Sequence, residues 1–542
     1  MSKKKNVKKK NLKDTKKNPN ANENVKSRYN VKNAVINYYL ILMFTVFPLF
    51  FTNQFARIRH DKYFVYLALS GVLIVVETVV LLITLSENNK GNLKEKKWYR
   101  QLSVPDYAFG ALILIYALST AFSITPLDAF TGEAGRNNGL LIFLVFFFVY
   151  IIISRWYAFK EYVFVFVAGG SLAVYLLSIL NFFYIDPLGM YRGYAEATVK
   201  DFTATIGNKN IMSAFCCLTI PLLLMLFMNT KNTVFHHIFR YVYLVVGGIG
   251  FAAMLCADSE SGFLGLVPTM ALILLYYSRN ITMLRKFFTF VASMLIAAKL
   301  LIVFSTVVRG VEKGFGTMQI TFIYDYKSLI AIAVTVAIAL GLWALERKNS
   351  ELVIPKAVPA VLIVIYAVGF IGIASLFVKY SFLDTESKLG GIMTFFRFNE
   401  KWGTHRGFMW IKAWEIFRTS GVKNLLLGWG PDTFYKAFAP YFAELTEKFN
   451  NSSTNCAHNE FLNYLITTGV FGLAAYLTLF VSAIVRAVKT ASKNPLSIVF
   501  IAPVVCYLFQ SVVNIANPIV TPLLFIFLAL SEAIVRKERL NK

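Results

Sequence analysis

Residues 357–379 read AVPAVLIVIYAVGFIGIASLFVK, an apolar run with no charged residue before its last position. A helix rises about 1.5 Å per residue, so a run of this length spans a bilayer hydrocarbon core about 30 Å thick. Comparable runs recur along most of the chain. The segment predicts a transmembrane helix, and its repetition predicts a polytopic membrane protein.

The composition of the whole chain supports this class. Of its 542 residues, 57% are hydrophobic and 15% are charged, and the mean hydropathy is +0.58. Ordinary soluble domains carry about 25% charged residues, so water-soluble classes are excluded. The net charge is +26, from 55 Lys and Arg against 29 Asp and Glu. Such an excess indicates nucleic-acid binding in a soluble protein, whereas in a membrane protein it can mark the cytoplasmic loops.

We expect about fourteen spanning segments. In lipid the backbone polar groups must be satisfied within each segment, so these are helices and not strands. Their expected bounds are 36–53, 63–85, 104–123, 139–154, 161–183, 208–228, 240–257, 261–278, 287–306, 327–345, 357–379, 458–482, 497–515 and 518–535. The predicted fold class is therefore all-α, a polytopic bundle of about 14 transmembrane helices.

Basic residues in alternate loops predict the orientation. If the N-terminal tail is cytoplasmic, each cytoplasmic loop carries Lys or Arg, and only the first outer loop, with Arg57, Arg59 and Lys62, departs from the positive-inside pattern. The excess charge then reports topology, and no nucleic-acid partner is expected. The predicted parts are a basic cytoplasmic tail (1–33), a transmembrane region of about 11 helices (34–379), a large extracytoplasmic loop (380–457), C-terminal transmembrane helices (458–535) and a cytoplasmic tail (536–542).

The N-terminal 33 residues are rich in Lys and nearly free of apolar residues. Such a composition cannot form a core, so we expect a disordered tail. A topology anchor is the favoured role. Contact with anionic lipid or with RNA is the alternative.

The loop 380–457 is the long exception among short connections, and it holds four of the seven Trp residues. A stretch from His405 to Arg418 has the apolar spacing of an amphipathic helix. Long structured loops on a rigid scaffold frequently carry function. We therefore expect the active part of the molecule here.

His458 and Asn459 are followed, after nine residues, by Gly469 and Gly472. On a continuous helix these two glycines lie on the face that carries His458. Small residues let a second helix approach closely, which would hold the imidazole at the membrane boundary. A structural histidine beside a packing motif is the alternative.

A second element precedes this motif. Arg406 is followed by Trp410 and then by the turn signal Gly428-Trp429-Gly430-Pro431-Asp432. The planar guanidinium of Arg406 suits phosphate oxygens. By itself, however, an Arg in a wet loop is usually only solvated.

Together these elements resemble the O-antigen ligase and polymerase superfamily of envelope glycosyltransferases. Residues 458–472 fit its pattern His-[Asn/Ser/Gln], nine residues, Gly-x-x-[Gly/Thr/Tyr], and the Arg, Trp and Gly-x-Gly-Pro elements stand in the family order. Looser similarities lie at 132–139, 207–210 and 510–518. Glu260 stands where members often carry an Arg that is a candidate for binding pyrophosphate, and Arg136, Arg397 and Lys401 are candidate substitutes.

The resemblance implies a metal-independent, inverting glycosyl transfer without a cofactor, on the outer face of a bacterial cytoplasmic membrane. The donor is a glycan on polyprenyl pyrophosphate, and the acceptor is a hydroxyl of another envelope molecule. His458 is expected to act as the general base or to orient the acceptor, and Arg406 to bind the pyrophosphate. The expected substrate-binding residues are Arg136, Arg397, Lys401, Asn459 and Trp410.

Other interpretations remain open. A bundle of this size also suits a flippase for lipid-linked oligosaccharides, although the two halves show no convincing similarity. A scaffold without catalysis is a third possibility. Cys456 beside His458 suggests a thiol–imidazole pair or metal ligands, but no second ligand pair follows. Glu77 and Lys299 lie within spans, where a charge indicates either function or a contact inside the bundle.

Overall fold

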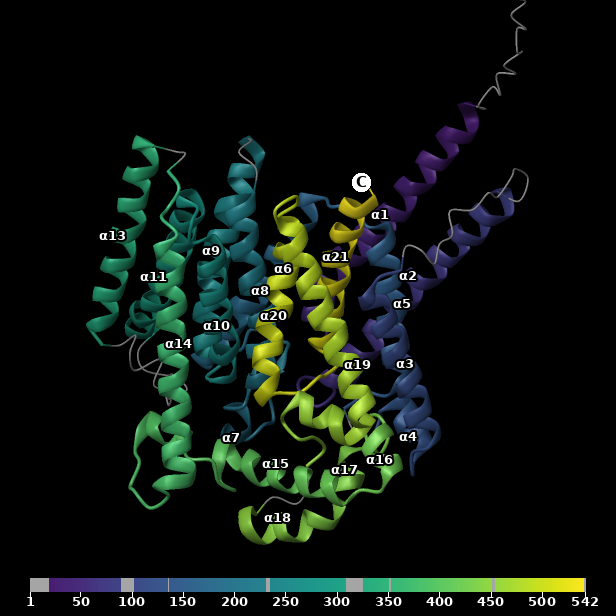
Figure 1. Ribbon diagram of the computed structural model, residues 1–542, viewed down its shortest axis with the longest axis vertical. Coiled ribbons are helices and arrows are strands. Elements are labelled where there is room, and N and C mark those ends of the chain that lie inside the picture. The colour runs from purple at the N-terminus through teal and green to yellow at the C-terminus, as the bar shows by residue number, and fades with distance from the viewer. Residues whose placement is uncertain are drawn as a thin grey trace, which may run out of the picture.

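The structure is a computed structural model that describes residues 19–88, 102–134, 136–230, 234–308, 325–349, 352–450 and 454–540. Within these ranges the chain is helical apart from one two-stranded hairpin and an isolated bridge, which confirms the predicted all-α class. Long helices run side by side, and α15 to α18 lie across the end opposite the C-terminus (Figure 1). The large loop is thus a helical layer over one end of the bundle.

The first part of the bundle leads up to the loop. Its elements are α1 (Pro19–Leu49), α2 (Ile58–Asn88), α3 (Val104–Ala121), α4 (Pro126–Thr131), α5 (Leu140–Trp156), α6 (Glu161–Phe182), α7 (Glu196–Val199), β1 (Phe202–Thr203), β2 (Gly207–Asn208), α8 (Lys209–Asn229), α9 (Val234–Cys256), α10 (Ser261–Tyr277), α11 (Ile281–Val308), α13 (Lys327–Lys348) and α14 (Ala357–Val378).

The rest of the chain forms the end layer and the last spans. Its elements are the π-helix η2 (Lys379–Leu383), the 3-10 helix η3 (Gly391–Phe396), α15 (Trp402–Thr419), α16 (Val422–Leu427), α17 (Phe434–Phe438), η4 (Ala439–Tyr441), α18 (Phe442–Phe449), α19 (Glu460–Ala491), α20 (Leu496–Gln510), η5 (Ser511–Val513) and α21 (Thr521–Leu540).

Eleven of the described helices are long and apolar enough to cross a membrane. The apolar helices α5 and α10 have 17 residues each, and α21 ends in a basic turn. Together with α5, α10 and α21, the eleven long helices lie at the positions of the fourteen expected spans. Helix α1 begins at Pro19, inside the expected tail, and residues 1–18 of that tail lie outside the described residues.

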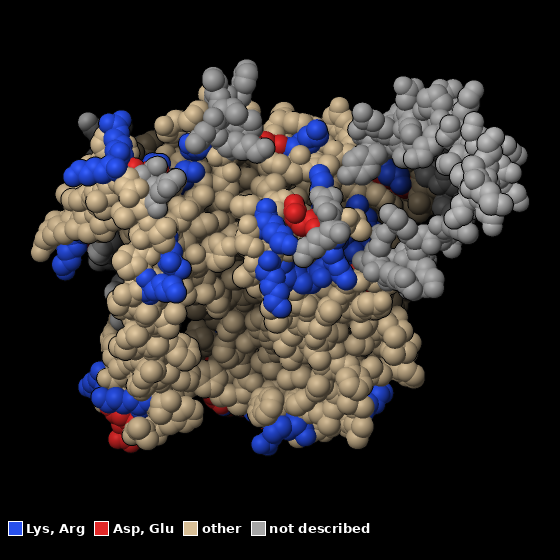
Figure 2. Space-filling view, turned by 45° about the horizontal axis from the view of Figure 1, so that its top comes forward, with Lys and Arg blue, Asp and Glu red and all other residues tan. Residues whose placement is uncertain are grey.

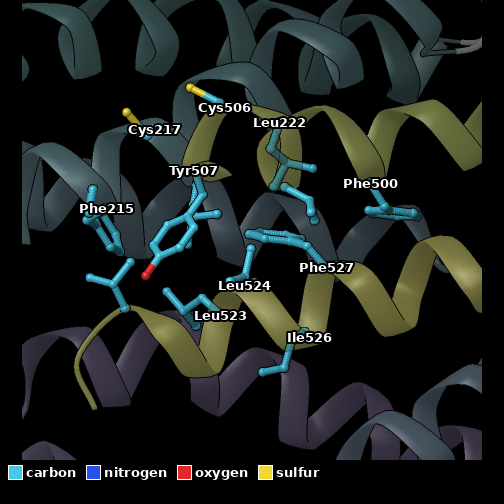
Figure 3. Packing of buried hydrophobic residues seen from close by; sticks show 14 of the residues in the cluster. Phe215, Cys217, Leu222, Phe500, Cys506, Tyr507, Leu523, Leu524, Ile526 and Phe527 are labelled. Atoms are coloured by element: carbon cyan, nitrogen blue, oxygen red, sulfur yellow. The ribbon is translucent and has the colours of Figure 1, made fainter. Parts of the chain in front are cut away.

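The centre of the bundle is formed by α8, α20 and α21. Almost all of α8 is buried, as are residues Thr521 to Arg536 of α21. Figure 3 shows Leu222, Tyr507 and Phe527 meeting where these helices pack together. In contrast, α14 has no buried residue, so it stands at the periphery with its apolar side chains exposed. The central helices therefore supply the rigid frame for the end layer.

Charged residues are distributed unevenly between the two ends of the bundle. Lys and Arg gather on the half that carries the C-terminus, next to a broad belt of uncharged residues (Figure 2). Within that half, Asp106 forms ion pairs with Arg536 and Arg155, and Arg486 pairs with Glu532 at 3.1 Å. Charges inside spans are costly unless they are paired. These pairs fix the relative positions of α3, α5, α19 and α21.

Candidate functional site

A cavity of about 500 Å³ lies beneath the end layer. Four separate stretches of chain line it: the α4–α5 connection, the hairpin and start of α8, the first turns of α15, and the segment before α19. The lining residues are Arg136, Asp201, Asn208, Lys209, Asn210, Thr404, Arg406, Met409, Thr454, Asn455 and His458. The structure thus brings His458, Arg406 and Arg136, three of the predicted site residues, to one cavity.

A left-handed backbone segment delivers Arg406 to this cavity. Gly403, Thr404 and His405 have φ values of 58°, 58° and 69°, so regular helix starts only after them. Gly407 permits the next turn to pack closely, since a Cβ there would lie 1.8 Å from the carbonyl oxygen of Asn399. A helix is present over the predicted stretch, with regular geometry from Arg406 onward. Its buried side includes Phe408 and Ile416, whereas Ile411 and Trp414 of the predicted apolar side are exposed.

His458 lies just outside α19. Asn459 is the N-cap of this helix, and its side-chain oxygen accepts the N–H of Leu462 at 3.0 Å. His458 itself has a φ of 48°, so the prediction that it continues the helix of Gly469 and Gly472 was wrong. The cause is local: an extended cap separates the histidine from the first helical turn. Glu460 anchors that turn by accepting hydrogen bonds from Tyr476 and Tyr507 at 2.6 and 3.0 Å.

The glycine motif has a different role from the one expected on a continuous helix. Gly469 has a φ of 68° and a ψ of −172°, which interrupts α19. Such a break leaves carbonyl groups of the preceding turn to other donors. Those of Ile466 and Thr467 accept the N–H groups of Trp429 and Gly430 at 3.0 and 2.9 Å. These two hydrogen bonds join the turn after α16 to the helix that follows His458.

The predicted close approach is confirmed at this break, with α16 and the following turn as the partner. A Cβ on Gly469 would lie 2.3 Å from the backbone of Leu426, and one on Gly428 would lie 2.2 Å from that of Thr467. Backbone atoms cannot yield as a flexible side chain can. The two glycines are therefore required for the contact between the end layer and α19.

Three cations face the cavity from different elements. The Nε of Arg136 donates to Asn455 at 2.9 Å, and Lys209 forms an ion pair with Asp201 at 3.0 Å. No hydrogen bond or ion pair joins the side chain of Arg406 to another of the residues that the structure describes. Burial lowers the pKa of Arg406, with partial compensation from Cys456 and Glu260. Arg406 remains a cation and is available to an anion.

The environment keeps His458 neutral. Burial lowers its pKa to about 3, and the positive charges of Arg136 and Arg406 act in the same direction. A neutral imidazole has one nitrogen that accepts and one that donates a hydrogen bond. At neutral pH His458 can therefore accept a proton or a hydrogen bond. An anion bound between the two arginines would offset their charges and increase its basicity.

The start of α8 contributes residues that the sequence analysis did not assign. Asn208 caps this helix by accepting the N–H of Asn210 at 2.9 Å, and Lys209 follows as its first residue. The amide oxygen of Asn210 accepts a hydrogen bond from Ser259 at 2.7 Å. The N-terminus of a helix carries partial positive charge and unpaired N–H groups, which favour an anion. The signal in the sequence was an Asn cap directly before a Lys at the start of an apolar span.

Glu260 stands near this group of cations, at the position where the family resemblance leads one to expect Arg. Burial raises the pKa of Glu260, and so does Asp258, while Arg406 and Lys209 lower it. The acid thus lies within electrostatic range of the cation that is free for an anion. The departure noted in the sequence therefore lies close to the cavity, although Glu260 does not line it.

The other predicted binding residues do not line the cavity. Arg397 and Lys401 line a second cavity of about 270 Å³ with Trp402. There Arg397 donates to the carbonyl oxygens of Asp384 and Ser387 at 3.1 and 2.7 Å, so it supports a loop. Asn459 caps α19, as described above. The indole N–H of Trp410 donates to the carbonyl oxygen of Ala457 at 2.9 Å, next to His458.

The remaining candidates lie elsewhere or have structural contacts. Cys456 is a buried free thiol, like the other four cysteines. Lys299 donates to the hydroxyl of Ser328 at 2.9 Å and so joins α11 to the start of α13. Glu77 is fully buried in α2, and its carboxyl oxygens have no hydrogen-bond partner among the described residues. None of these three observations assigns a reaction.

Residues 314–477 match the O-antigen ligase family. The matched range runs through the end layer into α19 and includes Arg406, the Gly428–Asp432 turn, His458 and Gly469. Arg136 and Lys209 lie outside it. No curated protein matches the chain.

Proposed function

We propose that this multi-pass membrane protein, which matches the O-antigen ligase family over residues 314–477, is a glycosyltransferase of lipid-linked glycans. The donor is a glycan on polyprenyl pyrophosphate, such as undecaprenyl pyrophosphate, and the acceptor is a hydroxyl of another envelope molecule. The observation that carries the proposal is the single cavity in which a neutral histidine faces three cations and a helix N-terminus.

The pyrophosphate of the donor binds among Arg136, Arg406 and Lys209. Its phosphate oxygens accept hydrogen bonds from the guanidinium groups and lie close to the positive end of the α8 dipole. The first two N–H groups of α8 already donate to Asp201 and Asn208. Negative charge grows on the pyrophosphate as the glycosidic bond breaks. Fixed positive groups aimed at that charge stabilise the transition state more than the ground state.

His458 receives the proton of the acceptor hydroxyl. The hydroxyl oxygen attacks the anomeric carbon from the side opposite the pyrophosphate and forms the new glycosidic bond with inversion. The bond between that carbon and the pyrophosphate oxygen breaks, and its electron pair leaves with the pyrophosphate. The basicity of His458 increases once the anionic donor offsets Arg136 and Arg406, so the donor prepares the base that the acceptor needs.

The cavity faces the outside of the bacterial cytoplasmic membrane in this proposal, and both termini face the cytoplasm. Two features support this orientation: the basic half carries the C-terminus, and the end layer lies at the opposite end. Lys388→Cys in the end layer and Lys537→Cys near the C-terminus provide a matched pair. In intact spheroplasts a membrane-impermeant maleimide should label only Lys388→Cys. Labelling of Lys537→Cys alone would reverse the orientation.

The catalytic assignment is tested with membranes that contain the full-length protein. The donor is the lipid-linked glycan extracted from a strain that lacks the protein. We expect His458→Ala and Arg406→Ala to lower transfer at least about 100-fold, the range for loss of a base or of a charge-stabilising donor. Arg418→Ala, at the exposed far end of α15, is the matched control and should retain activity.

Near wild-type transfer by either variant at equal expression would remove the role given to that residue. Metal independence is tested in the same assay, in which EDTA should leave the rate unchanged. Strong inhibition by EDTA that added Mg²⁺ reverses would contradict it. Transport of the donor without joining of glycans would support a flippase instead.

The acceptor determines whether the reaction is ligation or polymerisation. The two reactions leave different intermediates when the protein is deleted. Accumulation of short lipid-linked repeats would identify a polymerase, whereas accumulation of long unligated chains would identify a ligase. Mass spectrometry of the lipid extract distinguishes these outcomes.

A further inference from the structure

The turn that contains Gly428 and Pro431 continues into contacts with α4 and with the residues before it. Ser123, between α3 and α4, donates a hydrogen bond to the carbonyl oxygen of Trp429 at 2.9 Å, and Tyr435 donates to Asp128 of α4 at 3.0 Å. Between Trp429 and Tyr435 lies Asp432, which contacts the next connection, from α4 to α5. These segments are therefore held by residues about 300 positions later in the chain.

Asp432 makes the most direct of these contacts. One oxygen of its carboxyl group, Oδ2, accepts the backbone N–H of Arg136 at 2.5 Å and that of Asn138 at 3.0 Å. The side chain is buried, with a residue exposure of 7%. It does not line the main cavity. Because one oxygen accepts both N–H groups, it fixes the orientation of the backbone from Arg136 to Asn138.

The connection itself needs an external support. Between Gly132 and Gly139 the backbone closes on itself, with the N–H of Asn137 donating to the carbonyl oxygen of Gly132 at 2.7 Å. The described residues of this turn, 132–134 and 136–139, form no helix or strand, and Asn137 has a φ of 60°. Its backbone is held from outside by Asp432, and the Asn138 side chain donates to the carbonyl oxygen of Ala516 at 2.7 Å.

The position of the Arg136 backbone decides where its guanidinium lies. From this backbone the side chain reaches Asn455 at 2.9 Å, three residues before His458. If the backbone N–H groups lose their acceptor, the guanidinium is no longer held at the cavity. A displacement of about 1 Å is enough to weaken a charge-stabilising contact strongly.

We propose that Asp432 is a positioning residue of the donor site, because its carboxyl oxygen holds the Arg136 backbone so that the guanidinium binds the pyrophosphate. This role rests on the proposed function. Asp432 acts through Arg136 and does not touch the donor.

The proposal separates a hydrogen-bond role from a charge role. Burial raises the pKa of Asp432 to about 7, against the effect of the two N–H donors and of Arg136 and Arg59. An Asn at this position retains an oxygen that accepts both N–H groups. An Ala retains none. Asp432→Asn should therefore preserve donor binding, and Asp432→Ala should not.

Binding is measured with undecaprenyl pyrophosphate and the full-length protein in nanodiscs. We expect Asp432→Ala to raise Kd at least about ten-fold, as for the loss of a hydrogen bond to a charged group. Arg136→Ala should have a similar effect, and the double variant should be no weaker than Arg136→Ala alone. Asp186→Ala is the matched control, since Asp186 also accepts two backbone N–H groups, at 2.9 and 2.8 Å, in another connection. It should bind as the wild type does.

Hydrogen exchange gives a measure that does not depend on the function. The amides of Arg136 and Asn138 should exchange at least about ten-fold faster in Asp432→Ala and remain protected in Asp432→Asn. If Asp432→Ala does not accumulate as folded protein, Asp432→Ser, whose hydroxyl is too short to reach both amides, takes its place in both measurements.

The outcomes are distinguishable. Additive losses in the double variant, or an Asp432→Asn protein as weak as Asp432→Ala, would overturn the positioning role. The positioning role would also be overturned if Asp432→Ala showed faster exchange but unchanged binding of undecaprenyl pyrophosphate, provided that Arg136→Ala still lost affinity. If neither Arg136→Ala nor Arg406→Ala changes binding of undecaprenyl pyrophosphate, the proposed function fails as well.

Discussion

At the scale of single residues, the chemistry of His458 depends on its two arginine neighbours. Burial and positive charge keep the imidazole neutral when the cavity is empty. The same arginines are the groups that an anionic donor would neutralise. Binding and base strength are thus coupled through three side chains in one cavity. The pH dependence of the reaction reports this coupling.

The first prediction concerns that pH dependence. A base with a lowered pKa loses activity only when the pH falls below that pKa, which is about 3 for His458. Between about pH 8 and pH 5, kcat/KM, which reports the free enzyme, should show no decrease caused by His458. On acidification, kcat should begin to fall at a higher pH than kcat/KM does, because the bound donor raises the pKa of His458. The same profiles are measured in Asp432→Asn, which has no titratable carboxyl group at this position and so removes any contribution of Asp432 to the pH dependence. A decrease of kcat/KM centred near the ordinary histidine pKa of about 6.5 would contradict the neutral state.

The second prediction concerns Trp410. Its indole N–H holds the carbonyl oxygen of Ala457, the residue before His458. Trp410→Phe retains an aromatic ring but removes the donor, so kcat should decrease about ten-fold while the Kd for undecaprenyl pyrophosphate stays unchanged. Trp402→Phe is the control, because the Trp402 indole donates to Phe395, away from the cavity. Equal effects of the two variants would show that Trp410 only stabilises the end layer.

At the scale of elements, α19 illustrates how a break in a helix creates a binding surface for another segment. The interruption at Gly469 leaves two carbonyl groups that accept N–H groups from the turn after α16. That turn continues to Asp432, which holds the α4–α5 connection. The end layer and the helix that follows His458 are therefore joined through backbone atoms. A change at the break should affect both.

The third prediction tests this break. Gly469→Ala places a Cβ 2.3 Å from the backbone of Leu426 at a φ of 68°, where side chains are strained. Strain of this kind costs about 1–3 kcal/mol even without the clash. We expect a clearly lower thermal unfolding temperature in detergent and loss of transfer activity. Gly372→Ala in α14, where nothing lies within 4 Å, should unfold at or slightly above the wild-type temperature.

At the scale of the whole molecule, charges at the two ends have different tasks. Cations of the end layer and of α8 surround the cavity, whereas the charges near the C-terminus pair with one another between helices. The apolar belt between them matches a membrane interior (Figure 2). The buried pairs hold the bundle together at the end far from the cavity.

The fourth prediction concerns Asp106, which pairs with Arg536 and Arg155. Asp106→Leu leaves both guanidinium groups without this partner inside the bundle. Removal of one member of a buried pair typically destabilises a protein by about 3–5 kcal/mol. We expect a lower unfolding temperature with an unchanged KM in the remaining folded protein. Asp384→Ala, in an exposed loop of the end layer, should leave the unfolding temperature unchanged. A marked increase of KM in Asp106→Leu would place this cluster in communication with the cavity.

Much of the architecture follows from local sequence properties. Apolar length identifies the positions of the spans because each helix must satisfy its own backbone in lipid. The motif residues around His458 resemble the O-antigen ligase superfamily, and residues 314–477 match the model of that family. Periodicity also identified α15, although not the left-handed turn at its start. The assignments of Arg397 and Lys401 to the substrate site stay predictions that the cavity lining does not support.

The sequence by itself determined the fold class and the positions of the apolar helices, and it predicted the resemblance to the O-antigen ligase family, since each depends on hydrophobicity or on a short motif. Only the tertiary structure decided which cations share a cavity with His458, because Arg136, Lys209 and Arg406 lie on different elements far apart in the chain. It also decided that Gly469 interrupts α19. Glycine permits a left-handed conformation but does not require it. At Gly469 the reason for this conformation is the backbone of Leu426, which comes from another part of the chain.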